Sequence, residues 1–284
     1  MSLKELSLRI QKPFVKEKRE EAVNEFLMVH HFLLRSRRLK RKVKVDVYLP
    51  SLIDGTQPTY GLLLNDGQDA GQLKLIDTLT ERFRQAEKCN LIVVGIHAGD
   101  RLNEYGTAGF PDYNGRGWKA RSYTNFVIYQ LLPFLQAKYD AFHVRAHNAF
   151  AGFSLGGLSA MDMGWKHPEH FSGIGVFSGS FWWRSEEFNP EAPDADRIMH
   201  DYVRMTDYKE GLKFWFQAGT EDEEADRNNN GVIDAIDDTL DLMKELKAKG
   251  YTNEDMTYVE VEGGKHNFDT WSEVFPDFLH WWIG

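Results

Sequence analysis

One serine stands in a setting that could make it a nucleophile. Ser154 lies in the run Gly-Phe-Ser-Leu-Gly-Gly at positions 152–157. An apolar run precedes this G-x-S-x-G motif and a helix-forming run follows it, so the motif predicts a sharp strand-to-helix turn, the nucleophile elbow. Such a turn exposes the hydroxyl and points helix N–H groups at a developing oxyanion. The alternative is that Ser154 only caps a glycine-rich helix.

A serine hydroxyl needs a base to remove its proton, and in this arrangement the order along the chain is serine, acid, histidine. His266 fits because it follows the last expected strand, 256–261, and precedes a helix. His280 falls inside that helix, whereas His167 and His170 follow the serine too closely. The alternative is a surface histidine without a role.

The acid that orients the imidazole is expected after the preceding strand, 213–217. The exit of that strand is Gly-Thr-Glu-Asp at 219–222. Asp222 is the first choice and Glu221 the second.

Two peptide N–H groups are expected to bind the oxyanion. One is that of Leu155, directly after the nucleophile. The other is that of Gln68, in the Asn-Asp-Gly-Gln-Asp run at 65–69, where Gly67 permits close backbone approach.

Residues 226–237 match the spacing of a calcium-binding loop of the EF-hand type. Gly231 takes the sharp-turn position, but position 12 is an aspartate and no helix clearly precedes the loop. We therefore expect a structural Ca²⁺ that braces the loop holding Asp222, and no organic cofactor; a plain Asn/Asp/Gly turn is the alternative. The expected ligands are Asp226, Asn228, Asn230, the carbonyl of Val232, Asp234 and Asp237.

Short apolar runs alternate with longer helical patterns, which favours an α/β fold with a mostly parallel central sheet and helices on both faces, the α/β-hydrolase fold. The expected strands are 25–34, 43–49, 60–64, 91–96, 148–153, 173–177, 213–217 and 256–261. The expected helices are 73–86, 123–138, 155–166, 234–249 and 271–282.

The whole chain, 1–284, is predicted to be a single domain. Residues 1–24 would be an N-terminal extension. A surface loop is expected at 106–118, and 185–208 is a candidate lid or cap insert.

The net charge of -9 argues against a nucleic-acid partner. The basic run 35–44 is therefore interpreted as an exposed strand pair with charged outward positions, in preference to a binding patch. No apolar run is long enough to span a membrane, and no signal peptide is evident. These features favour a cytoplasmic location, although Met1-Ser2-Leu3 is equally compatible with an added start that replaces a removed leader. The oligomeric state is left open.

The motifs together resemble an esterase family of α/β-hydrolases that includes enterochelin esterases, esterase D-type enzymes and feruloyl esterases. The resemblance runs from about Val43 to the C-terminus, and Ser-Gly-Ser-Phe-Trp-Trp at 178–183 is most similar to the enterochelin-esterase branch. It implies a triad of Ser154, Asp222 and His266. The N-terminal sandwich domain of dedicated enterochelin esterases is not evident here. The other segments that carry the resemblance are 63–67, 101–105, 152–157, 219–222, 264–266 and Trp271.

Four further residues are candidates for substrate binding. Arg101 and Glu104 are expected to form a buried ion pair that either shapes the pocket or is purely structural. Trp182 and Trp183 would either wall the acyl site or belong to the core.

The sequence thus predicts hydrolysis of small-molecule carboxylic esters through an acyl-enzyme. One alternative is an acyltransferase that uses a sugar or alcohol acceptor. Another is a ligand-binding module with an inactive site.

Overall fold

The structure is a computed structural model and describes residues 15–85, 90–139 and 141–284. Within them, one sheet of nine strands has the order β1-β2-β3-β5-β4-β6-β7-β8-β9. The strands are β1 (Val15–Ala22), β2 (Leu27–Ser36), β3 (Arg41–Pro50), β4 (Thr59–Asn65), β5 (Asn90–Ile96), β6 (Asn148–Phe153), β7 (Gly173–Phe177), β8 (Lys213–Glu221) and β9 (Met256–Lys265).

The strand pairing changes from antiparallel to parallel at β5. The pairs β1–β2, β2–β3 and β3–β5 are antiparallel, whereas all pairs from β5 to β9 are parallel. The central strands β5, β6 and β7 are buried at every position, as expected where helices cover both faces of a parallel sheet. The carboxyl ends of the parallel strands meet at one edge, where α/β folds place their ligand sites.

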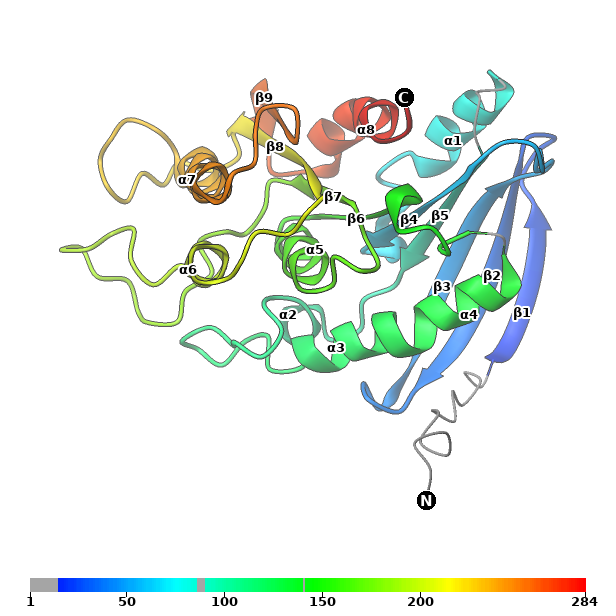
Figure 1. Cartoon of the computed structure of the whole chain (residues 1–284), viewed down its shortest axis with the longest axis horizontal. Helices are drawn as coiled ribbons and strands as arrows, with labels where there is room; N and C mark the ends of the chain where they lie inside the picture. The colour runs from blue at the N-terminus through cyan, green and yellow to red at the C-terminus, as the bar shows by residue number, and fades with distance from the viewer. Residues whose placement is uncertain (1–14, 86–89, 140) are drawn as a thin grey trace.

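Helices cover both faces of the sheet (Figure 1). On one face α1 and α8 pack against the sheet through residues such as Leu79 and Phe278. On the other face lie α3 to α7, including Phe126 and Leu158. The helices are α1 (Leu75–Arg84), α2 (Arg101–Glu104), α3 (Ala120–Phe126), α4 (Leu132–Lys138), α5 (Leu155–Lys166), α6 (Ile198–Met205), α7 (Asp234–Lys249) and α8 (Phe268–Ile283), with short 3₁₀ turns η1 (Gly67–Asp69) and η3 (Arg145–His147) and a π turn η2 (Val127–Leu131).

The expected α/β-hydrolase architecture is confirmed, with the eight expected strands and five expected helices in place. The helix expected at 123–138 is interrupted by the π turn η2, which lies directly before Pro133 near the start of α4. Proline has no N–H to donate, so the regular hydrogen-bond ladder cannot run through it. Position 86, the last residue of the helix expected at 73–86, lies outside the described residues.

Besides the short 3₁₀ turns, one strand and two helices of the described residues were not predicted. The first is β1, within the predicted extension 1–24; it is an edge strand rich in Lys, Arg and Glu, so it lacks the apolar alternation of a strand. The second is α6, within the candidate lid 185–208, which buries Ile198 and Val203. The third is the single turn α2.

Candidate active site

The backbone at Ser154 bends sharply between β6 and α5. Its φ is 54° and its ψ is −123°, a conformation that non-glycine residues rarely adopt. Its N–H donates to the carbonyl of Phe177 at 2.8 Å, and its own carbonyl accepts from Gly157 and Leu158 at 2.9 and 3.1 Å. The strained turn that the sequence motif predicts is therefore present, and it starts a regular helix.

The glycines around the serine are required by close packing. A Cβ at Gly152 would lie 2.4 Å from the carbonyl oxygen of Gly156. A Cβ at Gly156 would lie 2.8 Å from Oδ2 of Asp66, in the loop after β4. The first neighbour is backbone and the second is a carboxylate oxygen held by Arg101, so larger residues at these positions would displace the elbow or the Asp66 side chain.

Asp222 and His266 meet at the carboxyl ends of β8 and β9. The distance from Oδ1 of Asp222 to Nδ1 of His266 is 3.9 Å. The Asp222 side chain is fully buried and its Oδ2 accepts from the N–H of Gly219 at 3.1 Å. Contact between these strand ends requires Gly219, since a Cβ there would lie 2.2 Å from the carbonyl oxygen of Gly264.

Glu221, the second choice for the acid, points elsewhere. Its side chain is 59% exposed and lies 3.6 Å from Nζ of Lys265. The geometry therefore favours Asp222 as the partner of the imidazole.

The electrostatics of His266 suit a base. Burial lowers the pKa of its imidazole; the Asp222 carboxylate opposes this shift and the nearby Arg101 guanidinium adds to it. The ring also meets Trp271 edge-on, with 5.2 Å between ring centroids.

Trp271 links the histidine to the nucleophile elbow. Its ring stacks on Phe153, the residue before Ser154, at 5.2 Å, and its Nε1 donates to Oγ of Ser178 at 2.9 Å. In the sequence, Trp271 stands out only as part of the family resemblance, but in the structure its ring packs against His266.

The loop after β4, which carries the proposed oxyanion residue Gln68, is firmly held. Asp66 accepts a double hydrogen bond from Arg101, at 2.9 and 3.0 Å, and its N–H donates to the hydroxyl of Tyr105 at 2.9 Å. The side chain of Asn65 donates to the carbonyl of Gly156 at 2.8 Å. These contacts fix the loop against the start of α5.

The N–H groups of Gln68 and Leu155 have no backbone acceptor within the described part of the chain. Gln68 adds a side-chain contact of its own, because its Oε1 accepts from the N–H of Ala98 at 3.0 Å. N–H groups without acceptors are normal in the first turn of a helix, and an oxyanion hole uses such groups as its donors.

The expected ion pair between Arg101 and Glu104 is wrong, because each residue has another partner. Besides Asp66, Arg101 donates to the carbonyl of Phe153 at 3.2 Å. The buried Glu104 accepts two hydrogen bonds from Arg41, at 2.7 and 2.5 Å. Both residues lie on α2, but their side chains bind different neighbours.

The two tryptophans have different environments. Trp183 is fully buried, so the core alternative holds for it, and its ring closely approaches Gly106 and Gly117. Trp182 is 38% exposed, and Arg116 lies 5.3 Å above its ring. Trp182 also lines a cavity of about 290 Å³, together with Tyr113, Arg184, Phe188, Arg227 and Asp234.

Ser180 is a site residue that sequence reasoning missed. Its Oγ lies 3.3 Å from Oγ of Ser154, and its N–H donates to the carbonyl of Ser154 at 3.1 Å. Ser180 is buried in the loop after β7, the strand next to β6. The Ser-Gly-Ser run at 178–180 held this signal, but a second serine has no spacing rule that would place it beside the first.

The predicted calcium loop forms a compact turn. Asp226 accepts hydrogen bonds from the N–H groups of Asn230 and Gly231, at 3.1 and 2.9 Å, and Oδ1 of Asn230 accepts from Val232. Arg227 binds Asp234 with an N···O distance of 3.1 Å. Part of the predicted ligand set is therefore already paired within the protein.

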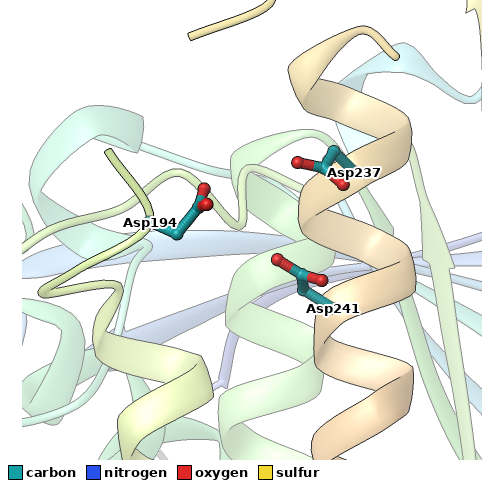
Figure 2. A group of neighbouring side chains, drawn as sticks. All are labelled: Asp194, Asp237 and Asp241. Carbon is teal, nitrogen blue, oxygen red and sulfur yellow. The ribbon is translucent and has the colours of Figure 1, made fainter. Parts of the chain in front are cut away.

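Asp237, which contacts that turn, also belongs to an unpredicted group of carboxylates. Figure 2 shows Asp237 and Asp241 on α7 facing Asp194, and oxygens of the three lie within 4.8 Å of one another. Asn228, a predicted ligand, donates its amide to Asp237 at 2.8 Å. Arg197 binds Asp241 at 2.7 Å. Cationic and amide groups thus share this cluster.

In the described part of the chain, no helix combines the length and apolar character needed to cross a bilayer.

The chain also matches a known protein family. Residues 36–282 match the family described as "Putative esterase". The chain belongs to this esterase family.

Individual similarities are distant but extensive. The chain is 24% identical over 251 residues to the uncharacterized protein YbbA of Bacillus subtilis (strain 168), covering 85% of this chain and 92% of that protein. The enterochelin esterase of Shigella flexneri superposes with a TM-score of 0.70 at 20% identity, over 90% of this chain and 58% of that one. A ferulic acid esterase superposes with a TM-score of 0.65 at 19% identity, over 90% and 98%. At such identities, the two superpositions establish the fold.

Proposed function

We propose that the protein is a serine hydrolase that cleaves carboxylic esters through Ser154, His266 and Asp222. The observation that carries the proposal is the strained backbone of Ser154, at φ 54°, supported by the contact of His266 with the buried carboxylate of Asp222. An unactivated serine would not need such a turn, since strain persists only where the surrounding structure enforces it. Membership of an esterase family supports the same reaction.

In the proposed mechanism, Oγ of Ser154 attacks the ester carbonyl while Nε2 of His266 takes its proton. The carbonyl oxygen becomes an oxyanion, which the N–H groups of Gln68 and Leu155 bind. Collapse of this intermediate breaks the bond to the alcohol, which leaves with the proton from His266. Water, deprotonated by His266, then attacks the acyl-enzyme, and the carboxylic acid and the free serine are released.

Asp222 would hold the imidazole in the required orientation and stabilise its protonated form. The proposed substrate contacts are Trp182 and Arg101. Arg101 would act mainly through the loop that it holds. Of the candidate lid at 185–208, the residues before α6 (185–197) are proposed to cover the site.

The test is labelling of the protein with a fluorophosphonate probe, combined with turnover of 4-nitrophenyl acetate. We expect the label on Ser154, and loss of both labelling and turnover in Ser154→Ala. Ser180→Ala is the matched control, because it removes the neighbouring hydroxyl and should leave Ser154 open to the label. Labelling of Ser180, or normal turnover by Ser154→Ala, would refute the proposal.

The same residues would transfer the acyl group to an alcohol if water were excluded. Product analysis with an added alcohol acceptor distinguishes an acyltransferase from a hydrolase. A structural Ca²⁺ in loop 226–237 remains a prediction and has no part in these steps.

A further inference from the structure

The hairpin formed by β2 and β3 carries a dense group of positive charge on a protein whose net charge is -9. Seven of the ten residues from position 35 to 44 are basic: Arg35, Arg37, Arg38, Lys40, Arg41, Lys42 and Lys44. We call residues 35–42, which form the turn and its two strand ends, the basic hairpin.

Most of these cations have no acidic partner among the described residues. Arg41 binds Glu104, and Lys44 lies 3.4 Å from Asp46. In the part of the chain that the structure describes, the other five form no ion pair with a carboxylate. An anion from outside could therefore bind them without displacing an internal ion pair.

The charge pairing and backbone conformation of the hairpin are locally unfavourable. Arg35 and Lys42 are directly opposite across the antiparallel ladder, and both are exposed. Like charges in this position destabilise a strand pair. Lys40 has a φ of 56°, where glycine or asparagine would be favoured. Such local conflicts are expected at functional sites.

The basic hairpin projects beyond the neighbouring strands. Among the described residues, β1 pairs with β2 only up to Leu34, and β5 pairs with β3 only from Val45. Charged residues on such open edges prevent pairing with other chains. The same exposure makes the charges accessible to an anion.

A hollow of about 600 Å³ lies within the basic hairpin. Its six lining residues all have polar or charged side chains, and five of them are basic: Arg35, Ser36, Arg37, Lys40, Arg41 and Lys42. Arginine and lysine side chains clustered around a hollow favour a carboxylate or phosphate group as its occupant.

The basic hairpin lies at the edge of the sheet where the catalytic loops emerge. Because β3 is antiparallel to β5, with Val45 opposite Ile96, the start of β3 lies at the carboxyl end of β5. In Figure 1 the turn between β2 and β3 projects on the side of α2 and α3.

One turn of helix connects the basic hairpin to the nucleophile elbow. At one end of α2, Glu104 binds Arg41 of the hairpin. At the other end, Arg101 binds the carbonyl of Phe153, next to Ser154. A substrate that spans α2 would reach both the basic hairpin and the nucleophile elbow.

We propose that the basic hairpin is an anion-binding subsite, which holds a carboxylate or phosphate group of the substrate while Ser154 attacks its ester bond. This inference rests on the proposed esterase function and adds a substrate class, esters that carry an anionic group away from the reacting bond. The positive field would lower KM for such esters and leave kcat nearly unchanged.

The test uses 4-nitrophenyl monoesters of linear dicarboxylic acids, from glutaric to dodecanedioic acid, each compared with its methyl-capped neutral counterpart. We expect kcat/KM to favour the free carboxylate about tenfold or more at the chain lengths that reach the hairpin. This preference should shrink in 0.5 M NaCl because salt screens exposed charges. Inorganic tripolyphosphate should compete with the carboxylate esters and not with the neutral ones.

The double variant Arg35→Ala/Lys42→Ala should lose the carboxylate preference and keep its turnover of neutral esters. Its melting temperature should not fall, since the change removes a like-charge pair. The matched control is Lys213→Ala/Lys247→Ala, which removes two exposed lysines at the start of β8 and on α7. This control should keep the preference.

Hydrolysis of neutral esters without a carboxylate preference at any chain length would overturn the subsite and leave the esterase function intact. A preference that survives in Arg35→Ala/Lys42→Ala would also overturn it. Absence of Ser154-dependent hydrolysis of every ester would refute the proposed function, and with it the subsite role. Binding of anionic vesicles or nucleic acid by the hairpin, without a carboxylate preference, would assign the charge to a macromolecular partner and contradict the proposal.

Discussion

Oδ1 of Asp222 lies 3.9 Å from Nδ1 of His266 and, within the described residues, has no hydrogen-bond partner although it is fully buried. A buried carboxylate oxygen without a partner is costly, and the imidazole is the group placed to satisfy it. The distance exceeds that of a normal hydrogen bond. Catalytic hydrogen bonds are often long before substrate binds and shorten in the complex. Substitution of Asp222 and of Glu221 should therefore show which of the two is the acid.

Asp222→Asn should reduce kcat for 4-nitrophenyl acetate by a factor on the order of 10³ to 10⁴, because an amide cannot hold the imidazole in the orientation and charge state that catalysis needs. Glu221→Gln should change kcat by less than about twofold, since exposed ion pairs contribute little. Steady-state kinetics of both folded variants provides the comparison. A larger loss in Glu221→Gln than in Asp222→Asn would reverse the assignment.

The pH dependence of kcat/KM should reflect the lowered pKa of His266. The base must be neutral to accept a proton, so activity is lost as pH falls through its pKa. Burial and Arg101 move this pKa below the ordinary value of 6.5, so the acid limb should lie below pH 6.5. In Arg101→Gln the loss of a neighbouring positive charge should move the limb to higher pH. An acid limb above pH 6.5 in the wild-type protein would contradict the electrostatic assignment.

Gly156→Ala should damage both stability and activity. The added Cβ would lie 2.8 Å from Oδ2 of Asp66, so the loop carrying Gln68 must shift. Overpacking of this kind costs about 1–3 kcal/mol, which lowers the melting temperature by several degrees. Gly55→Ala is the control, because a Cβ there meets nothing within 4 Å. Equal melting temperatures and activities for the two variants would show that the elbow tolerates the bulk.

Added Ca²⁺ should raise the melting temperature if the loop at 226–237 binds the ion. A ligand that binds only the native state adds about 2.7 kcal/mol at 100 times its Kd. Asp226→Ala should remove the effect, since this carboxylate would be the first ligand of the loop. Loss of the effect in Asp241→Asn alone would place the ion in the Asp194, Asp237 and Asp241 group. Identical melting curves with EDTA and with Ca²⁺ would rule out both positions.

The sequence by itself determined the architecture and the elbow. The expected ranges 148–153 and 173–177 coincide with β6 and β7, and 155–166 and 234–249 coincide with α5 and α7. β6 and β7 are predictable as short, mostly apolar runs of strand length, and α7 is predictable from the helical spacing of its apolar residues. The G-x-S-x-G turn is equally local, since its glycines make room for atoms only a few residues away, as Gly152 does for Gly156.

Only the tertiary structure decided which side chains are partners. Arg101 and Glu104 are neighbours along the chain, yet they bind Asp66 and Arg41. Ser180 and Trp271 reach the site because β7 lies beside β6 and α8 packs on the same sheet. Ion pairs and site contacts join residues distant in sequence, and their geometry depends on strand order and loop packing. The local pattern of a single sequence contains neither strand order nor loop packing. It could therefore supply the candidate residues of the site but not their contacts.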